Sequence, residues 1–254
     1  MPVLRVSEVD VRFGGIHAVQ GVDLDADVGY VTGLIGPNGA GKTTTFNDVT
    51  GLQTPTAGRV FLDERDVTEL KAHQRARLGI ARTFQRLEVF GSLTARDNIL
   101  VAAEIRKSWS RDGSDPRKVT EELIERVGLR SVASDRVDAM PTGMARLVEV
   151  GRALATRPRV LLLDEVGSGL DHSETEELGS LLLELAADGL ALLLVEHDVD
   201  LVMRVCKRIH VLDFGRIIAV GTPAEIQANP AVQAAYLGAA DEALHDEEQE
   251  TALS

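Results

Sequence analysis

Residues 36–43 read Gly-Pro-Asn-Gly-Ala-Gly-Lys-Thr, a run in which three glycines precede a lysine and a hydroxyl residue. An apolar stretch, residues 30–35, comes before the run, and residues 43–51 predict a short helix that ends at a glycine. Glycines let consecutive backbone N–H groups curl around phosphate oxygens, and a helix N-terminus adds favourable partial charge. A glycine-rich turn that merely contains a lysine is the alternative, but the flanking strand and helix favour a phosphate site.

This loop predicts ATP, with its magnesium ion, as the bound group. A lysine at this spacing reaches the β- and γ-phosphates, so Lys42 is a candidate catalytic residue. The next hydroxyl can bind Mg²⁺, which makes Thr43 a candidate metal ligand. We expect nucleotide contacts from the whole loop and the residue after it: Gly36, Pro37, Asn38, Gly39, Ala40, Gly41, Lys42, Thr43 and Thr44.

Two acidic residues, Asp164 and Glu165, end the apolar run 160–163. Parallel sheets that are buried on both faces bind ligands at the carboxyl ends of their strands. Asp164 is suited to hold Mg²⁺, through water, because hard cations prefer oxygen ligands. Glu165 is suited to orient or deprotonate an attacking water, which is a catalytic role. A pair of solvated loop acids is the alternative, and the phosphate loop makes it the weaker one.

The elements around these residues alternate between strands and helices. Residues 4–13 and 19–28 alternate apolar and polar positions, which predicts two antiparallel edge strands before the buried strand 30–35. Residues 93–156 are mostly helical in pattern, with a loop at 108–116. Further strands are predicted at 58–62, 80–85, 160–163, 191–195, 209–213 and 216–220, and further helices at 69–80, 173–187, 223–227 and 231–237.

This order predicts an α/β fold with a mixed, mainly parallel sheet core, an N-terminal antiparallel β subdomain and an inserted helical subdomain. We expect one domain over residues 1–238, with the helical insertion at about 87–157. Residues 239–254 are acidic and predict a solvated, disordered tail.

Composition limits the class of protein. The 254 residues are 44% hydrophobic and 26% charged, which is ordinary for a soluble globular chain. The single cysteine, Cys206, excludes a disulfide framework and fits a reducing cytoplasm, and its neighbours predict a helix core position. Apolar runs are far shorter than the roughly 20 residues of a spanning helix, and the N-terminus lacks a signal-peptide stretch. Any membrane role is therefore expected to be peripheral, and the net charge of −13 argues against a nucleic-acid partner.

Taken together, the two motifs and the helical stretch between them resemble the nucleotide-binding subunit of ABC transporters over nearly the whole chain. The resemblance implies that Gln85 touches Mg²⁺ and couples to the membrane subunit, and that His197 contacts the γ-phosphate as a catalytic residue. It implies that Asp171 communicates across a dimer and that Phe13 stacks on adenine. A structural strand-end histidine and a core-packed phenylalanine are the alternatives for His197 and Phe13.

Within this family, several segments resemble the importer ATPases for branched-chain amino acids, and the lipopolysaccharide-export ATPases are close relatives. The segments are residues 13–15, 79–85, 196–198, 201–203 and the Ala-Tyr-Leu-Gly ending at 235–238. The transported molecule is set by membrane and binding subunits, so this finer likeness is associational.

The family's signature segment, usually Leu-Ser-Gly-Gly-Gln, departs from that pattern here. Residues 140–144 read Met-Pro-Thr-Gly-Met, so Gly143 can still present its backbone N–H to a γ-phosphate, but Pro141 and Met144 remove donors. Each lost neutral hydrogen bond is worth about 0.5–1.5 kcal/mol, and more with a charged partner. We therefore expect slower hydrolysis or a weaker ATP-bound dimer rather than an inactive protein. Val166 replaces a usual proline, which should matter less.

The resemblance implies a head-to-tail pair of cassettes, identical or not, on the cytoplasmic face of a membrane. Permease subunits, and a substrate-binding protein if the transporter is an importer, are the expected partners. Gly143 of one chain would cover ATP held by the other, and residues 85–98, with Phe90 exposed, would dock the permease. The residues expected on ATP in each chain are Lys42, Thr43, Gln85, Asp164, Glu165 and His197.

Two other classes stay open. A soluble cassette ATPase acting on ribosomes or chromosomes would normally carry tandem cassettes or a long coiled coil, and the sequence has neither pattern. A non-transport or regulatory subunit with weakened hydrolysis would explain the altered signature, but Lys42, Glu165 and His197 argue against it. A small-molecule kinase fits poorly because no arginine-rich lid is evident.

Overall fold

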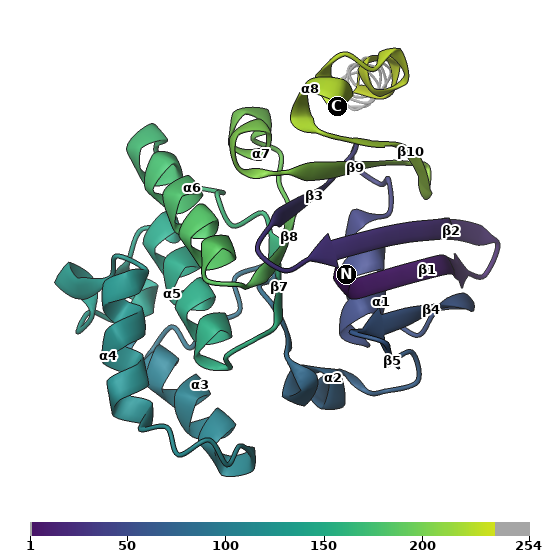
Figure 1. The fold of residues 1–254 in the computed structure, drawn as a ribbon. Coiled ribbons are helices and arrows are strands. Elements are labelled where there is room, and N and C mark those ends of the chain that lie inside the picture. The colour runs from purple at the N-terminus through teal and green to yellow at the C-terminus, as the bar shows by residue number, and fades with distance from the viewer. Residues whose placement is uncertain (1, 237–254) are drawn as a thin grey trace, which may run out of the picture.

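Two β-sheets carry the fold, which the computed structural model describes over residues 2–236 (Figure 1). The N-terminal sheet is antiparallel in the order β2-β1-β4-β5. Its strands are β1 (Pro2–Phe13), β2 (Ile16–Asp27), β4 (Ala57–Leu62) and β5 (Arg65–Asp66). The two predicted antiparallel strands are confirmed as the β1–β2 hairpin, but the prediction that both are edge strands was wrong, because β1 also pairs with β4 and lies inside the sheet. Strand β5 was not predicted because two residues are too few to show a pattern.

The second sheet has six strands in the order β10-β9-β3-β8-β7-β6. Strands β3, β6, β7, β8 and β9 run parallel, and β10 closes the edge as an antiparallel hairpin partner of β9. This mixed sheet confirms the predicted α/β class. The strands are β3 (Val31–Ile35), β6 (Ile80–Arg82), β7 (Val160–Asp164), β8 (Ala191–Val195), β9 (Arg208–Asp213) and β10 (Arg216–Gly221).

Alternation along the buried strands creates two cores. In β7, Leu161 and Leu163 join a core that continues into the helices, whereas Val160 and Leu162 face a second core against the N-terminal sheet. Because successive side chains of a strand point to opposite faces, a strand covered on both sides must be apolar throughout. All five residues of β3, β7 and β8 are buried accordingly, including Asp164 at the end of β7.

A bundle of helices lies between β6 and β7 in the sequence and forms a separate lobe at the left of Figure 1. It contains α3 (Ala95–Trp109), α4 (Pro116–Arg126), two 3₁₀ turns (Arg130–Val132 and Val137–Ala139) and α5 (Thr142–Ala155). The remaining helices pack around the six-stranded sheet: α1 (Lys42–Thr50), α2 (Ala72–Leu78), α6 (His172–Ala187), α7 (Val199–Val205), α8 (Pro223–Gln227) and a last helix over residues 230–236.

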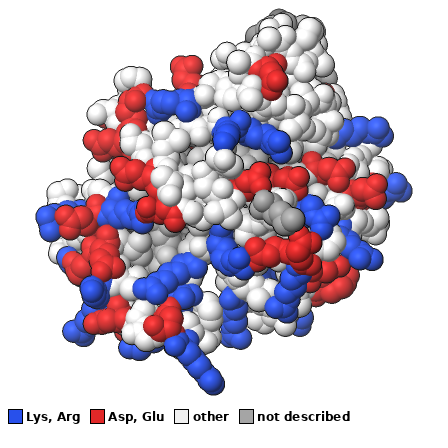
Figure 2. Space-filling model, in the orientation of Figure 1, with Lys and Arg blue, Asp and Glu red and all other residues white. Residues whose placement is uncertain are grey.

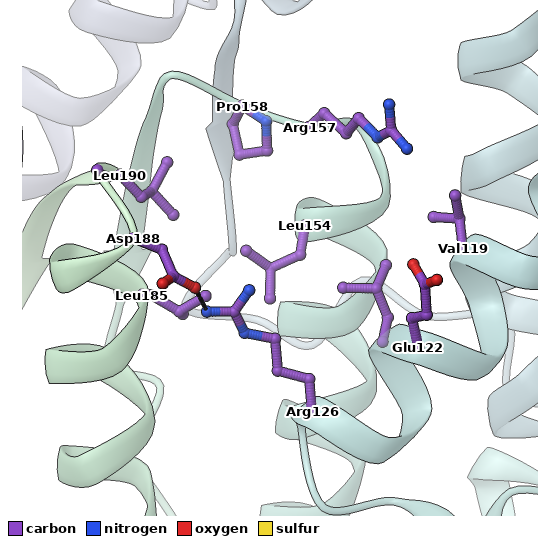
Figure 3. A pocket seen from close by; sticks show the side chains of 11 residues that line it. Val119, Glu122, Arg126, Leu154, Arg157, Pro158, Leu185, Asp188 and Leu190 are labelled. Carbon is purple, nitrogen blue, oxygen red and sulfur yellow. Dashed lines mark hydrogen bonds and ion pairs between the residues drawn. The ribbon is translucent and has the colours of Figure 1, made fainter. Parts of the chain in front are cut away.

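A seam joins the helical lobe to the sheet core. The seam holds a cavity of about 340 Å³. Figure 3 shows its lining, which includes Leu154 of α5 and Leu185 of α6. Arg126 of α4 donates a hydrogen bond across it to the carboxylate of Asp188, the residue after α6. Apolar contact and one partly exposed ion pair therefore tie α4 to the core at this point, and such ion pairs contribute at most about 1 kcal/mol.

Some predicted boundaries were wrong. The helix predicted over residues 69–80 begins at Ala72 and ends before Gly79, whose φ of 111° favours glycine. The strand predicted over residues 80–85 stops at Arg82, because side chains of α5, rather than a neighbouring strand, hydrogen-bond to the backbone of Phe84.

Cys206 ends α7 in a buried position, and burial raises the pKa of its thiol to about 12, so the predicted core position is confirmed. Leu237, Gly238 and the predicted tail at 239–254 lie outside the described residues.

Figure 2 shows acidic and basic side chains interspersed over one face of the molecule. Among the described residues, no helix is both long and apolar enough to cross a lipid bilayer.

Candidate nucleotide site

The phosphate loop joins β3 to α1 in a conformation that requires glycine at two points. A Cβ atom on Gly36, whose φ is 155°, would lie 1.9 Å from the carbonyl oxygen of Leu212. A Cβ atom on Gly41, whose φ is 108°, would lie 2.6 Å from the carbonyl oxygen of Ala18. Both distances are far below van der Waals contact, so strands β2 and β9 hold the loop as a backbone cradle that only glycine allows.

Lys42 folds back over this cradle. Its Nζ donates hydrogen bonds to the carbonyl oxygens of Gly36, at 2.7 Å, and Pro37, at 2.9 Å. The side chain is 8% exposed, and burial lowers its pKa, while the nearby carboxylates of Glu165 and Asp164 oppose that shift. Phosphate oxygens would replace both carbonyls with charged acceptors, which make stronger hydrogen bonds with an ammonium group.

The remaining loop positions differ in exposure. Asn38, Gly39 and Thr43 are exposed at the surface of the loop, Pro37, Gly41 and Thr44 are half-buried, and Gly36, Ala40 and Lys42 are buried. The carbonyl oxygen of Ala40 accepts a hydrogen bond from the N–H of Gly215, at 2.9 Å, in the β9–β10 turn. The β9–β10 hairpin therefore supports the loop, while Thr43 at the start of α1 remains exposed.

Glu165 contacts two other predicted site residues, Gln85 and His197. Its Oε1 accepts a hydrogen bond from Nε2 of Gln85, at 3.1 Å, and lies 2.9 Å from Nε2 of His197. These three residues come from the ends of β6, β7 and β8, which the parallel register brings to one edge of the sheet. Glu165 has a φ of 52°, in the left-handed region that non-glycine residues rarely adopt, and such strain is concentrated at functional sites.

Asp164 sits beside this cluster but is turned into the protein. It is 1% exposed, and its Oδ2 accepts a hydrogen bond from Nη2 of Arg82 at 2.7 Å. Burial raises the pKa of Asp164, and the hydrogen bond and charge of Arg82 act against that rise. Arg82 was not among the predicted site residues. Its signal in the sequence is an arginine at the end of a short buried strand, three residues before Gln85.

Helix α5 holds the backbone around Gln85, a role the sequence did not reveal. Oε1 of Glu149 accepts a hydrogen bond from the N–H of Phe84 at 3.1 Å. Nη1 of Arg146 donates to the carbonyl oxygen of Phe84 at 2.6 Å, and Nη2 donates to that of Gln85. Because these partners are more than 60 residues apart in sequence, no local pattern could predict the contact.

Glu196, next to His197, lies in the segment 196–198 that resembles the family, but it was not among the predicted site residues. It is 7% exposed, its Oε1 accepts from the N–H of Gly167 at 2.6 Å, and its Oε2 accepts from the N–H of His197 at 3.3 Å. Burial raises its pKa, and both backbone hydrogen bonds oppose the rise. Glu196 therefore links the loop after Glu165 to the loop that carries His197.

Comparison with known proteins decides the family. A family model described as "ABC transporter" matches residues 19–168, and a model described as "Branched-chain amino acid ATP-binding cassette transporter" matches residues 216–242. The chain belongs to the ABC transporter family. Within that family it is a nucleotide-binding subunit and an ATPase, so the resemblance recognised in the sequence is confirmed.

Relatives of this cassette align along nearly their whole length. The chain is 39% identical to the high-affinity branched-chain amino acid transport ATP-binding protein BraF of Pseudomonas aeruginosa and 38% identical to LivG of Escherichia coli, over 94% of the chain and 99% of each relative. It is 36% identical to the lipopolysaccharide export system ATP-binding protein LptB of Acidithiobacillus ferridurans, over 87% of the chain and 90% of that protein.

Solved cassettes share the fold. A nucleotide-free ATP-binding cassette from an ABC transporter superposes with a TM-score of 0.83 at 28% identity, covering 93% of the chain and 99% of that structure. A cassette in its ADP conformation superposes with a TM-score of 0.83 at 29% identity, covering 94% of the chain and 99% of that structure.

Three predicted residues lie away from the Glu165 cluster. Phe13 ends β1 with 48% of its surface exposed, which rules out the core-packing alternative. Asp171 is the N-cap of α6, where its Oδ1 accepts a hydrogen bond from the N–H of Glu174 at 2.8 Å. Gly143 lies in the first turn of α5 against Leu170, whose Cδ2 would be 2.5 Å from a Cβ at that position. Their predicted roles toward adenine and a second subunit remain predictions.

The donor set of the site fits a magnesium ion that is completed by phosphate and water. In residues 2–236, no group of three or more His, Cys, Asp or Glu side chains could enclose a metal by itself. Oxygen ligands are nevertheless present, because Thr43 offers an exposed hydroxyl, Gln85 an amide oxygen and Asp164 a carboxylate. Mg²⁺ usually keeps several waters and binds through one or two protein oxygens plus substrate phosphates.

Proposed function

We propose that this cassette powers the uptake of branched-chain or other amino acids, as one half of an ATP-bound dimer attached to membrane permease subunits. The convergence of Gln85 and His197 on Glu165, beside the loop of Lys42, is the observation that carries the catalytic part of this proposal. The amino-acid part is supported by BraF and LivG, which are named as branched-chain amino acid transport proteins, and by the second family model at residues 216–242.

Hydrolysis follows from the positions of the side chains. The phosphate loop binds the triphosphate, and Lys42 exchanges its two carbonyl partners for phosphate oxygens. Glu165 accepts a proton from the attacking water as the water oxygen bonds to the γ-phosphorus, and the bond to the β–γ bridging oxygen breaks. Mg²⁺, held by Thr43, Gln85 and Asp164, would neutralise charge that develops on the phosphates.

Oε1 of Glu165 is shared by Gln85 and His197, the two residues that are expected to turn toward the γ-phosphate and its ion. The His197 side chain is 50% exposed, whereas that of Glu165 is 18% exposed. When Gln85 and His197 move to the phosphate and its ion, Oε1 of Glu165 becomes free to accept the proton of a water molecule. Binding would thus assemble the catalytic arrangement.

The N-termini of two helices, α1 and α5, support the proposal of a second subunit. Helices α3, α4, α6, α7 and α8 have their first turns capped by a Thr or Asp side chain, whereas α1, α2 and α5 have no side-chain cap, and of these three only α1 and α5 carry residues of the predicted nucleotide site. The free N–H groups of α1 face the phosphate loop, and those of α5 include the N–H of Gly143. Uncapped helix N-termini bind anions, so α5 of a partner subunit could cover the γ-phosphate. A solved dimeric cassette bound to ADP and Pi, 25% identical to this chain, supports this arrangement.

The rest of the assembly follows from the same proposal. Residues 1–238 would form one cassette with its helical insertion at about 87–157, peripheral on the cytoplasmic face of the membrane. A substrate-binding protein would deliver the amino acid if the transporter is an importer. The altered signature at Pro141 and Met144 would slow hydrolysis or weaken the closed dimer.

The substitution Glu165→Gln tests the catalytic assignment. Glutamine keeps the size and one hydrogen-bond acceptor but cannot take the proton, so steady-state ATP hydrolysis should fall at least about 100-fold. ATP binding should persist, and the fraction of dimer seen by light scattering with ATP should rise. A matched control is Glu184→Gln, which alters an exposed acidic residue of α6 away from the predicted site residues. Turnover of the Glu165→Gln variant at the wild-type rate would contradict the assignment.

Lys42→Ala tests the phosphate loop itself. The substitution removes the only ammonium group placed over the cradle in the described structure, so ATP affinity should fall about 10-fold or more. Equilibrium binding of a fluorescent ATP analogue measures the effect, and unchanged affinity would overturn the proposed nucleotide site.

A further inference from the structure

Arg82 connects three segments that carry nucleotide-binding residues. Its side chain is 5% exposed, and its guanidinium donates through Nη2 to Asp164 at 2.7 Å and through Nη1 to Oδ1 of Asn47 at 2.6 Å. Asp164 ends β7, and Asn47 lies in α1, five residues after Lys42. A single rigid group therefore spans the distance between the predicted magnesium ligand and the helix of the phosphate loop.

Aromatic rings hold this guanidinium in place. Its carbon lies 5.4 Å from the centroid of Phe46 in α1 and 5.0 Å from that of Phe84, next to Gln85. Its Nε also donates to the carbonyl oxygen of Thr83 at 3.2 Å. Stacking and the forked donors fix both the position and the plane of the group, which a lysine ammonium cannot reproduce.

The carboxylate of Asp164 is constrained from its backbone as well. Its N–H donates to Oγ1 of Thr83 at 3.0 Å, and the N–H of Thr83 donates to the carbonyl oxygen of Leu162 at 2.9 Å. Of the two carboxylate oxygens, Oδ2 is engaged by Arg82, while no described residue donates a hydrogen bond to Oδ1. One oxygen is thus held by the protein, and the other is left for a ligand.

We propose that Arg82 is a positioning residue for the magnesium ion of the bound nucleotide. Arg82 holds Oδ2 of Asp164 and links it to α1 and to the segment of Gln85, so that Oδ1 is oriented to accept a hydrogen bond from a metal-bound water. The proposal rests on the proposed nucleotide site and adds a residue to it. Groups that orient a metal ligand typically change metal affinity by about 10- to 100-fold when they are removed.

The prediction concerns the gain in affinity that magnesium provides. The probe is the non-hydrolysable analogue β,γ-imido-ATP, titrated into the full chain in excess Mg²⁺ and again in EDTA. In Arg82→Met, which keeps an apolar stem between the two rings, the affinity in Mg²⁺ should fall by about 10- to 100-fold, whereas the affinity in EDTA should change by less than about 2-fold. The same split should appear, to a smaller degree, in Asn47→Ala, which frees the guanidinium from α1.

Arg159→Met is the matched control. Arg159 precedes β7 at the opposite end of the same strand, and its Nη2 donates to Oδ1 of Asp63 at 2.9 Å. This variant should keep the wild-type gain from magnesium. Failure of wild type and control to bind the analogue more tightly with Mg²⁺ would overturn the proposed magnesium site and this inference together.

Two results would overturn the role of Arg82 alone. One is an equal loss of affinity in Mg²⁺ and in EDTA, which is the signature of a general structural defect. The other is an unchanged ratio between the two conditions. Arg82→Lys covers the case in which the methionine variant does not fold, because lysine keeps the positive charge but not the forked donors. We expect this variant to lose part of the affinity gain that Mg²⁺ provides. A gain equal to that of the wild type would contradict a positioning role for Arg82.

Discussion

Buried charged side chains either serve the nucleotide site directly or stabilise its supports. Arg75 is 1% exposed, and its guanidinium donates to the carbonyl oxygens of Thr68, Leu70, Asp48 and Val49. It thereby satisfies the C-terminal carbonyls of α1, the helix whose N-terminus faces the phosphate loop. The side chain of Asp48 in the same helix differs, because both of its carboxylate oxygens are buried and no described residue hydrogen-bonds to them.

Asp48→Asn should flatten the pH dependence of stability. Burial raises the pKa of Asp48 from 3.8 to about 7, with Arg75 opposing the rise. The raised folded-state pKa means that the contribution of Asp48 to stability is complete below pH 3.8 and declines as the pH rises through about 7. Between pH 5.5 and 8 the difference in unfolding free energy between wild type and variant should change by about 2 kcal/mol.

Urea denaturation of both proteins at several pH values measures this effect. The comparison must be made as a difference, because burial lowers the pKa of His210 to about 4 and its contribution to stability is lost as the pH falls from 6.5. Asp48→Asn leaves that contribution unchanged, so it cancels. Parallel pH profiles for the two proteins would show that Asp48 is ionised throughout, with an unrecognised partner.

Sequence patterns identified the functional residues that lie in short contiguous motifs and missed those whose partners are far away in the sequence. Lys42 and Glu165 stand in short runs whose spacing has a chemical reason, so they could be named directly. Arg82 pairs with Asp164 across 82 positions, and Glu149 reaches Phe84 across 65. Such partners are chosen by the packing of β6, β7 and α5, which no local period encodes.

At the scale of elements, α5 connects two predicted functions. Its uncapped N-terminus presents the N–H of Gly143, and one to two turns later Arg146 and Glu149 grip the backbone beside Gln85. A movement of this helix therefore has to displace either its hydrogen bonds or the Gln85 segment. The strands were predicted well because alternation and burial are local, but the ends of α2 and β6 depend on Gly79 and on α5.

Glu149→Ala should loosen the Gln85 segment. The substitution leaves the partly buried N–H of Phe84 without its acceptor and the buried Arg146 without its neighbouring carboxylate, so unfolding free energy should fall by about 1–3 kcal/mol. Hydrogen exchange should accelerate in peptides that cover residues 83–86 more than in those covering β8. The exposed Glu121, paired with Arg96, provides the control: Glu121→Ala should cost less than about 1 kcal/mol. If residues 83–86 of Glu149→Ala keep the wild-type protection from hydrogen exchange, Glu149 does not stabilise this segment.

At the scale of the whole molecule, a groove lies between the sheet core and the helical lobe. A cavity of about 440 Å³ is lined mainly by apolar surface, and its lining comes from α1, α2, β6, α3 and α5. Two of the lining residues, Leu52 and Ile105, have 55% and 60% of their surfaces exposed. Phe90, five residues before the start of α3, is 46% exposed. Exposed apolar side chains around a concave surface are typical of protein interaction sites.

Ile105→Glu should therefore separate assembly from nucleotide binding. A carboxylate in the groove would have to be desolvated by an apolar helix of a permease, so the membrane subunits should co-purify with the variant at least about 10-fold less efficiently. ATP affinity of the isolated cassette should stay within about 2-fold of wild type, because Ile105 lies in α3 with 60% of its surface exposed and is not one of the predicted nucleotide-site residues. Leu183→Glu, on the exposed face of α6 and 46% exposed, is the matched control and should leave co-purification unchanged. Equal loss of assembly in both variants would show that added negative charge, rather than this groove, is responsible, and normal assembly of Ile105→Glu would place the docking surface elsewhere on the cassette.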